Sequence, residues 1–578
     1  METAEIYEKI AALSAYGKEH PEDHEALQLL ADLYFLTDNY PAMQACAEKL
    51  LRAMPHHQAA LLLLARAKIA AGDNLAAAHC LEQGFSGELP REAVYLLALC
   101  YEESRQVMKR QRLLRNALRQ KERDDAFTCW LWQELGGDEI RLGHRDKARD
   151  AFLTAAKKAV SPEDKKAAYS SFLMCLNYDE GSPEQMLKAH KKYERLLPAI
   201  KPLPERPLQK RKKLRIGYIS ADLYHHAMSY FVYHLLQSHS EDFSVYCYQT
   251  SSICDDATRQ LKNERLFWRD LSACSPVEMA QAIYSDAIDI LVELGGHTAG
   301  NALEVLAYRP APLQLCGLGY VNTTGLRAVD YFLTDPVLDP PGKETGFVEE
   351  LLYLPHTHWS YAPRTDAPDC GEAACKKNGF ITFGSFNNFA KITDEVLALW
   401  QQILARLPAA RLILKNGIFA DPEAKAQIEK EFQKKGFLAE QLEFRPATAG
   451  HMQEYRDIDI ALDPFPYQGG ATTCEALYMG VPVITLAGNA HRSRIGASIL
   501  TVIGLTDCIA FSKDAYVEKA VELAADVVHL DFLHRGNLRE SMINSPLMRP
   551  EIYMQDLEKA YKKIWESHIF AEKTKTSL

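Results

Sequence analysis

The pattern of apolar and polar residues changes in character about one third of the way along the chain. Residues 1–195 are rich in Ala, Leu, Glu, Lys and Arg, and their apolar positions recur with helical spacing. The stretch 26–31 recurs at 60–65, and the turn 38–40 recurs at 72–74, which is a spacing of about 34 residues. The sequence therefore predicts an N-terminal domain, 1–195, built from repeated pairs of helices.

Alanines line the second predicted helix of each pair, at 42–47 and again at 76–78. Small residues let paired helices approach closely and stack, and the pattern resembles tetratricopeptide repeats. Two units are clear, whereas a third from about residue 91 and a fourth at about 143–159 are degenerate. The alternative is an irregular helical bundle. A stacked array would offer a concave groove for an acceptor protein or peptide, or a surface for homo-oligomer formation.

A proline-rich, basic stretch at 196–213 predicts a linker, and after it strands alternate with helices. This alternation predicts parallel sheets covered by helices on both faces. We expect two such α/β units, 214–370 and 371–578, in which ligands bind at the carboxyl ends of the strands. The predicted strands are 214–220, 245–248, 289–294, 380–383, 411–414, 442–444, 458–462 and 481–485.

The turn Gly469-Gly470-Ala471-Thr472-Thr473 lies between a predicted strand and a predicted helix. A strand, a small-residue loop and a helix together present free backbone N–H groups and a positive helix end to phosphate. Thr472 and Thr473 are expected to cap the first turn and to hydrogen-bond an anionic ligand. Glu475, one turn further on, could accept hydrogen bonds from sugar hydroxyls. The alternative is an ordinary crossover with a tight turn.

Three further polar side chains follow predicted strands or precede that turn. His226 could act as a general base or as a polar clamp on substrate, or it could only cap the next helix. Lys391 could neutralise a phosphate or a leaving group, and a surface lysine opening a helix is the less favourable alternative. His451 could contact a base or ribose, or be an exposed structural histidine.

Glycine-rich loops in the first α/β unit carry four more candidates, which we expect on the acceptor and sugar side of the site. They are His297, Thr298, Tyr320 and Thr324. Beyond the last predicted strand, His491, Arg492 and Arg494 could add positive charge to an anion site, with a surface cluster as the alternative.

Bulk properties narrow the class of protein. The 578 residues are 47% hydrophobic and 25% charged, as in globular proteins of several domains. A formal net charge of −11 argues against wholesale nucleic-acid binding. The 13 cysteines follow no zinc-binding spacing. With no signal peptide and no apolar run of about 20 residues, we expect a cytoplasmic protein that does not cross a membrane.

An ordered series of motifs closely resembles the SPINDLY / protein O-GlcNAc transferase family of inverting, metal-independent glycosyltransferases. The resemblance covers about residues 214–566, behind repeats that fit the family's layout. It implies helical repeats followed by a GT-B pair of Rossmann-like domains, a nucleotide-sugar co-substrate and no other cofactor. The motifs are HAMSYF, VELGGHTAGN, RPAPLQ, GLGYVNTTGL, DYFLTDPVLDPP, FGSFNNFAKIT, HMQEY, LDPFPYQGGATTCEALYMGVPVITLAG and SPL.

The resemblance also implies roles for individual residues. Lys391 matches the essential lysine that contacts the nucleotide diphosphate, and His226 matches a histidine of the substrate site. Asn388 neighbours the diphosphate and His451 packs against the base. Thr472 binds phosphate and Glu475 binds ribose. The general base remains open.

Two departures from the family pattern concern the donor. Gly470 and Ala471 stand where the animal enzyme has a histidine and a threonine, and Thr448 stands where it has a lysine. The segments around Lys391 and Thr472 are nearer to SPINDLY, whose plant member uses GDP-fucose. We expect UDP-GlcNAc as donor and Ser or Thr as acceptor. The alternatives are GDP-fucose as the donor, an asparagine of an adhesin- or flagellin-type protein as the acceptor, or a scaffold that binds the donor without turnover.

Overall fold

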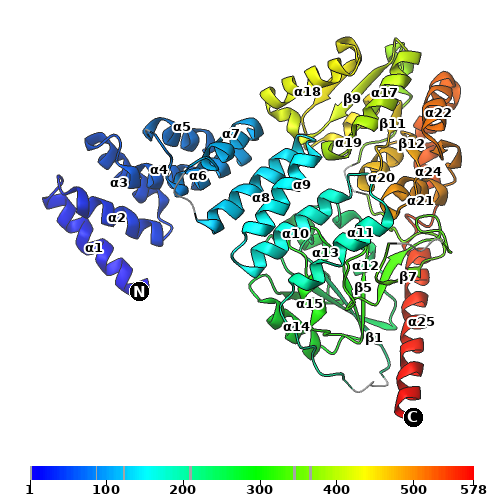
Figure 1. Cartoon of the computed structure of the whole chain (residues 1–578), viewed down its shortest axis with the longest axis horizontal. Coiled ribbons are helices and arrows are strands. Elements are labelled where there is room, and N and C mark those ends of the chain that lie inside the picture. The colour runs from blue at the N-terminus through cyan, green and yellow to red at the C-terminus, as the bar shows by residue number, and fades with distance from the viewer. Residues whose placement is uncertain are drawn as a thin grey trace. The chain divides into compact units, whose positions relative to one another are not determined.

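The computed structural model describes residues 3–85, 87–120, 124–206, 211–342, 346–363 and 367–577 (Figure 1). By compactness the chain forms two units, Met1–Asp138 with Ala420–Ala426 and Glu139–Phe419 with Gln427–Leu578. Within the described ranges, no helix is both long enough and apolar enough to cross a membrane.

The first unit consists of paired helices, as the periodicity predicts. The turns predicted to be equivalent are built alike: Asn39 and Asp73 accept hydrogen bonds from the backbone N–H of Ala42 and Ala76, which caps the following helix. Fully buried alanines let the helices pack closely. The helices are α1 (Thr3–Glu19), α2 (His24–Leu36), α3 (Tyr40–Ala53), α4 (Gln58–Ala70), α5 (Asn74–Gly84), α6 (Arg91–Glu103), α7 (Val107–Ala117) and α8 (Asp125–Arg141).

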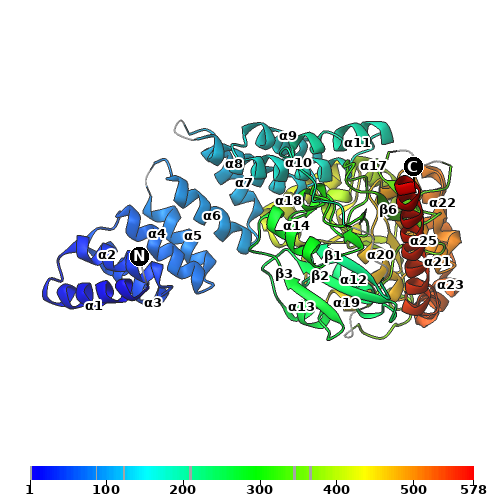
Figure 2. The ribbon, with the colours of Figure 1, turned by 90° about the horizontal axis from the view of Figure 1, so that it is seen from below.

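The next helices, α9 (Arg145–Lys158), α10 (Pro162–Leu176) and α11 (Pro183–His190), belong to the second unit. Figure 2 shows α10 and α11 lying over the first α/β lobe, and Phe172 and Leu173 of α10 share a hydrophobic core with Ile219 of that lobe. By compactness the boundary therefore lies at Asp138, whereas the sequence predicts a repeat domain that runs to residue 195.

The predicted linker is bound to the first lobe along its described part. Arg206 donates hydrogen bonds to the backbone carbonyls of Ile288 (2.8 Å) and Pro310 (2.9 Å), and the N–H of Leu203 donates to the carbonyl of Tyr308. Residues 207–210, which carry part of the predicted linker, lie outside the described residues. The described part of the linker therefore packs against the first lobe.

The first lobe contains a parallel sheet in the order β3-β2-β1-β4-β5-β6-β7 among the described residues. The apolar runs of the sequence predict β1, β2 and β4. The other four strands are not predicted, because they are short and lack a clear alternation of apolar and polar residues. The strands are β1 (Leu214–Ser220), β2 (Phe243–Gln249), β3 (Leu266–Asp270), β4 (Ile290–Glu293), β5 (Leu313–Cys316), β6 (Tyr331–Thr334) and β7 (Glu350–Tyr353). The helices between them are α12 (Ser229–Gln237), α13 (Asp256–Leu261), α14 (Pro276–Ser285) and α15 (Leu303–Ala307).

The second lobe contains a parallel sheet in the order β10-β9-β8-β11-β12-β13. All strands except β13 are predicted from the sequence, with shifts of a few residues. The strands are β8 (Thr382–Ser385), β9 (Arg411–Lys415), β10 (Leu442–Arg445), β11 (Ile460–Leu462), β12 (Val483–Leu486) and β13 (Ile509–Ala510). The helices are α16 (Ala374–Asn378), α17 (Asp394–Arg406), α18 (Pro422–Lys434), α19 (His451–Glu454), α20 (Ala471–Tyr478), α21 (Ile495–Val502), α22 (Lys513–Ala525), α23 (Val527–Phe532) and α24 (Leu538–Ile543).

The last helix, α25 (Pro550–Ser577), packs against the first lobe, although it follows the second along the chain (Figure 1). Glu558 accepts hydrogen bonds from the N–H and hydroxyl of Ser240, and its carboxylate lies 3.0 Å from Nδ1 of His239. The sequence assigns this helix to the second lobe, so the structure revises its position. This C-terminal helix therefore connects the end of the second lobe to the first lobe.

Candidate active site

The order of the strands reverses between β8 and β11 in the second lobe and between β1 and β4 in the first. In open α/β sheets, ligands bind where the chain turns in opposite directions from two adjacent strands. Lys391 follows β8 and Thr472 follows β11, while His226 follows β1 and His297 follows β4. These four predicted site residues thus come from the two switch points, whereas Tyr320 and Thr324 follow β5 and His451 follows β10.

A hydrogen bond between Thr472 and Asn387 joins the segments that follow β11 and β8 at the second-lobe switch point. The hydroxyl of Thr472 donates to Oδ1 of Asn387 over 2.9 Å. Asn387 is buried, whereas Asn388, the residue named from the sequence, is exposed and caps the short helix Phe389–Lys391. Asn387 is therefore the asparagine beside the turn, and a doubled Asn-Asn leaves no sequence signal to tell which of the two faces inward.

The small-residue turn leaves the N-terminus of α20 uncapped. The helix begins at Ala471 with Gly470 as N-cap, and no side chain accepts from its first turn. The predicted capping by Thr472 and Thr473 is therefore wrong, because both lie inside the helix. A Cβ on Gly469 would lie 2.6 Å and 2.7 Å from the hydroxyl oxygens of Thr473 and Thr472, so only glycine fits there. The uncapped N–H groups suit an anion.

Lys391 carries positive charge to this turn. Its ammonium donates to the carbonyl of Gln468 over 2.7 Å and lies 4.0 Å from the ring centroid of Tyr467. Burial lowers the pKa of Lys391 to about 8, and the nearby carboxylate of Asp463 opposes that shift. Asp463 in turn accepts from the N–H of Gly469 over 2.7 Å, so it holds the turn and attracts the lysine electrostatically.

Helix α9 and the end of α10 support the lysine loop. Arg145 at the start of α9 donates to the carbonyl of Ile392 over 3.1 Å and to that of Ala390 over 3.5 Å, on either side of Lys391. The ring of Tyr178, after α10, lies 5.4 Å from that of Tyr467. The helical region therefore contacts the donor-side loop directly, which no local pattern in the sequence indicates.

His451 and Glu475 lie together, as the resemblance implies for residues around one nucleoside. Nε2 of His451 is 3.0 Å from Oε1 of Glu475, and the hydroxyl of Tyr455 donates to Oε2 over 3.3 Å. The same tyrosine hydroxyl also lies 3.3 Å from the carbonyl of Thr472. Glu475 is buried and oriented by both partners, and a carboxylate has acceptor capacity beyond two hydrogen bonds.

In the first lobe, His226 is an accessible histidine after β1. Its Nδ1 accepts from the N–H of Met228 over 3.3 Å and lies 3.8 Å from the carboxylate of Asp222. Five residues after His226, Phe231 of α12 packs on Trp359 with ring centroids 4.6 Å apart. A Cβ on Gly470 would lie 3.8 Å from Cη2 of the same tryptophan. Trp359 thus connects the segment after His226 to the turn of the second lobe.

The other first-lobe candidates are engaged in internal contacts. The ring nitrogens of His297 lie 3.1 Å from the Ser170 hydroxyl and 2.8 Å from the carbonyl of Thr324. The hydroxyl of Tyr320 lies 2.7 Å from Nε2 of His190 and accepts from the Asn177 amide.

Thr324 and Thr298 are also used within the lobe. The hydroxyl of Thr324 donates to Glu349, and that of Thr298 donates to the carbonyl of Gly295 over 2.9 Å. His297, Tyr320 and Thr324 are at most 1% exposed, whereas Thr298 is half-buried. We therefore interpret His297, Tyr320 and Thr324 as residues that hold the loops and α10–α11 in place, and not as the substrate contacts that the sequence predicts.

One Asp-x-Asp pair, Asp457 and Asp459, precedes β11 and could be mistaken for a metal motif. Asp457 accepts from Arg445 over 2.6 Å, while Asp459 accepts from the backbone N–H groups of Cys375 and Thr382. Both lie before the strand, at the opposite end from the turn. Over the described ranges, no group of three or more His, Cys, Asp or Glu side chains is arranged to hold a metal ion.

A cavity of about 750 Å³ adjoins the segment that carries His226. It is lined by residues of α12, α13 and the segment after Trp359, among them Ser229, Tyr233, Asp256 and Pro363. At the second-lobe turn itself, the enclosed space between Asn387, Asp463 and Thr472 is only about 10 Å³.

The sequence of this chain matches one protein family and several known proteins. The family model described as glycosyl transferase family 41 matches residues 199–362 and 375–557. The probable UDP-N-acetylglucosamine–peptide N-acetylglucosaminyltransferase SPINDLY of Solanum lycopersicum is 37% identical over 427 residues, which are 71% of this chain and 45% of that protein. The corresponding probable enzyme SEC of Arabidopsis thaliana is 30% identical over 371 residues, 62% of this chain and 38% of that protein.

A solved structure matches most of the chain. A lysine-to-methionine variant of the Thermobaculum terrenum O-GlcNAc transferase superposes with a TM-score of 0.78 and 30% identity, covering 89% of this chain and 98% of that one. The chain spans about half the length of the curated relatives it matches.

Proposed function

Because the chain belongs to glycosyl transferase family 41, we propose that it transfers a sugar from a nucleotide donor to a hydroxyl group of a protein. The observation that carries this proposal is the second-lobe switch point. There a half-buried ammonium, an uncapped helix N-terminus and two hydroxyl groups converge on one turn. Such a cluster of fixed donors suits a diphosphate that gains negative charge during the reaction.

In the proposed reaction, the acceptor oxygen attacks the anomeric carbon from the face opposite the leaving group, so the configuration inverts. The hydroxyl loses its proton as the new bond forms, and the electron pair of the broken bond passes to the diphosphate oxygen. Lys391 and the N-terminus of α20 stabilise that charge without reorganising, because Gln468 and Asp463 already hold them in place. With this charge supplied by the protein, a metal ion is not required for the step.

The proposed donor is UDP-GlcNAc. The curated relatives and the solved structure named above carry N-acetylglucosamine in their names, and His451 with Glu475 offers a ring and a carboxylate for a nucleoside. GDP-fucose is the second candidate, because the open turn at Gly470 and Ala471 has no bulky side chain in front of the sugar.

The proposed acceptor is a Ser or Thr of a target protein. The cavity of about 750 Å³ beside α12 is lined by His225, the neighbour of His226 in the sequence, and is large enough for several side chains of a bound peptide. The repeats of the first unit provide the stacked alanine-lined helices that such recognition uses.

Donor hydrolysis and transfer, measured separately with UDP-GlcNAc and GDP-fucose and with EDTA present, test this function. We expect turnover with UDP-GlcNAc that EDTA does not change, and intact-mass analysis of acceptors should show the added sugar on Ser or Thr. Donor binding without any turnover, seen by calorimetry across an acceptor panel, would favour a scaffold instead. Sugar mapped to asparagine would move the protein to a different acceptor class.

A further inference from the structure

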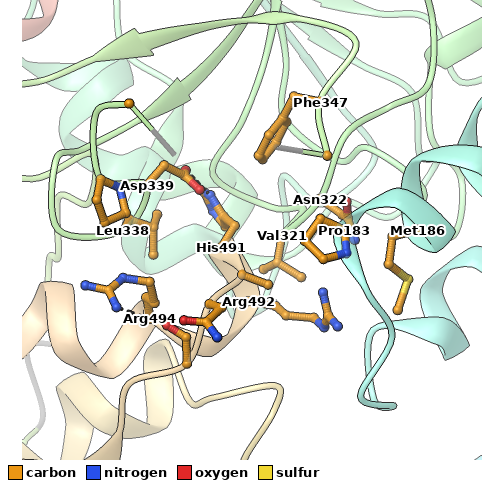
Figure 3. Close-up of a pocket in the computed structure, with 16 residues that line it drawn as sticks. Pro183, Met186, Val321, Asn322, Leu338, Asp339, Phe347, His491, Arg492 and Arg494 are labelled. Carbon is orange, nitrogen blue, oxygen red and sulfur yellow. Dashed lines mark hydrogen bonds and ion pairs between the residues drawn. The ribbon is translucent and has the colours of Figure 1, made fainter. Parts of the chain in front are cut away.

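A separate cavity of about 420 Å³ lies between α11, the loops after β5 and β6, and the segment 488–494 (Figure 3). One wall is apolar and the other is cationic. The apolar wall is formed by Pro183, Met186, Val321, Leu338 and Phe347. The cationic wall is formed by Arg492 and Arg494, and next to them Asp339 lies 2.7 Å from Nδ1 of His491 on the same lining. The sequence marks His491, Arg492 and Arg494 as candidates for an anion site.

Arg492 is a buried cation with few partners. It is 3% exposed, and its hydrogen bonds to described residues go to the backbone carbonyls of Asp179 (3.2 Å) and Gly181 (3.1 Å). Its Nε is buried and has no hydrogen-bond partner among the described residues. Figure 3 shows its side chain reaching toward Pro183 and Met186 of α11.

Arg494 is also bonded to carbonyls alone. It donates to Val337 over 2.7 Å and to Gly488 over 3.0 Å. Across the part of the chain that the structure describes, neither guanidinium forms an ion pair with a carboxylate. Burial lowers the pKa of both arginines, which reflects the unfavourable environment of these two charges.

The carboxylates near the cavity already have other partners. Asp339 lies 2.7 Å from Nδ1 of His491, and Asp335 lies 3.0 Å from Nδ1 of His358. Asp179 accepts from Arg149 over 3.1 Å. Asp179 and Glu180 therefore act on Arg492 through space, and Asp335 and Asp339 act on Arg494 in the same way. Among the described residues neither guanidinium has a carboxylate in direct contact, which is an unfavourable state for a buried charge.

We propose that this cavity binds a phosphate-type oxyanion carried on a small organic group. The planar fork of Arg492 matches the oxygens of a phosphate, and Arg494 adds positive charge at the other end of the same cavity (Figure 3). The apolar wall would receive the organic part, and the volume lies within the range of ordinary ligand pockets.

The proposed site is distinct from the diphosphate site, although the two share a support. The N–H of Gln468 donates to the carbonyl of Arg492 over 3.1 Å, while the carbonyl of Gln468 accepts from Lys391. The Arg492 side chain bonds instead to the turn between α10 and α11. The proposal does not depend on the glycosyltransferase function, because it concerns binding alone.

The test is calorimetric titration of the full chain with inorganic phosphate and with phosphoserine. Lys391→Met serves as the background in which phosphate binding at the donor turn is weakened. We expect saturable binding of both probes in Lys391→Met as in the parent, with phosphoserine the tighter because its organic part contacts the apolar wall. Arg492→Gln should weaken this binding by about tenfold or more.

Arg492→Gln could also destabilise the fold, because Arg492 bonds two carbonyls, so a second variant keeps the test decisive. Asn489 is exposed on the cavity lining. Asn489→Glu places a carboxylate there and should weaken binding by about tenfold, whereas Asn489→Gln should leave it unchanged. The proposal is overturned if no probe binds, if binding disappears in Lys391→Met, or if Asn489→Glu binds as tightly as Asn489→Gln. Equal affinity for the two probes would overturn the organic part of the proposal.

Discussion

The switch points of the two lobes carry similar sets of polar residues but use them differently. In the second lobe, Lys391 and the α20 N-terminus keep donors directed at one turn. In the first lobe, His297 and Tyr320 have their polar atoms bonded to α10 and α11. His226 alone among the first-lobe histidine candidates remains accessible.

This difference shows that position after a strand does not by itself define a binding residue. The loops of the first lobe hold the helices α10 and α11 by hydrogen bonds. Arg145 and Tyr178 of the same helical region contact the loops around Lys391 in the second lobe. We propose that His297 and Tyr320 support the site. Lys391, the N-terminus of α20 and the accessible His226 are the groups that we expect to contact the substrate. Four experiments test this division.

The largest effect is expected from Lys391→Met. Removing the ammonium withdraws the charge that stabilises the leaving diphosphate, so kcat should fall on the order of 10²–10³-fold while the fold remains stable. Donor hydrolysis and transfer rates measure the change, with Lys391→Arg as a variant that keeps the charge but alters its shape. Turnover of Lys391→Met at the parental rate would contradict the assigned role.

The pH dependence of turnover should follow the same lysine. Because burial lowers the pKa of Lys391 to about 8, kcat/KM should fall as pH rises above about 8 and the ammonium is lost. Stability should move in the opposite sense. Between about 8 and the unfolded value of 10.5, the unfolded chain binds more protons at this position, so rising pH favours the folded state.

Rate profiles and urea unfolding across that pH range measure both trends. In Lys391→Met, the part of the rise in stability with pH that comes from Lys391 should be missing. A rate that stays level from pH 7 to pH 10 would show that the charge of Lys391 is not needed.

Tyr320→Phe should lower the stability of the fold and leave kcat unchanged. The substitution leaves His190 and Asn177 with unpaired buried groups, so the free energy of unfolding should fall by about 1–3 kcal/mol. Urea unfolding measures this fall, and Tyr233→Phe, at an exposed tyrosine of the same lobe, should change stability by no more than about 0.5 kcal/mol. A loss of kcat in Tyr320→Phe at a temperature where it is fully folded would restore this residue to the substrate side.

Thr472→Val should have the smallest effect, on donor binding. It removes a hydroxyl that the turn orients through Asn387, and we expect the KM for the donor to rise by about tenfold. Thr501→Val on α21, whose hydroxyl bonds only within its own helix, is the matched control. An unchanged KM in Thr472→Val would mean that the helix N-terminus binds the phosphates without this side chain.

Much of the fold and of the second-lobe site could be predicted because the signals are local. The repeat spacing, the alternation of strands and helices, and the strand-turn-helix around Thr472 each lie within a short stretch of sequence. The membership of α9–α11 in the unit that holds the α/β lobes, and the packing of α25 on the first lobe, could not be predicted, since both depend on which side chains meet after folding.

By itself, the sequence determined the element types, the two α/β lobes and the residues that could carry the chemistry, since these follow from residue type and spacing. Only the tertiary structure decided which of those residues keep a free polar atom. Tyr320 is occupied by His190, 130 positions away in the chain, and Asn387 rather than Asn388 meets Thr472. The physical reason is that a polar group is available to a ligand only if no distant part of the chain has already satisfied its hydrogen bonds.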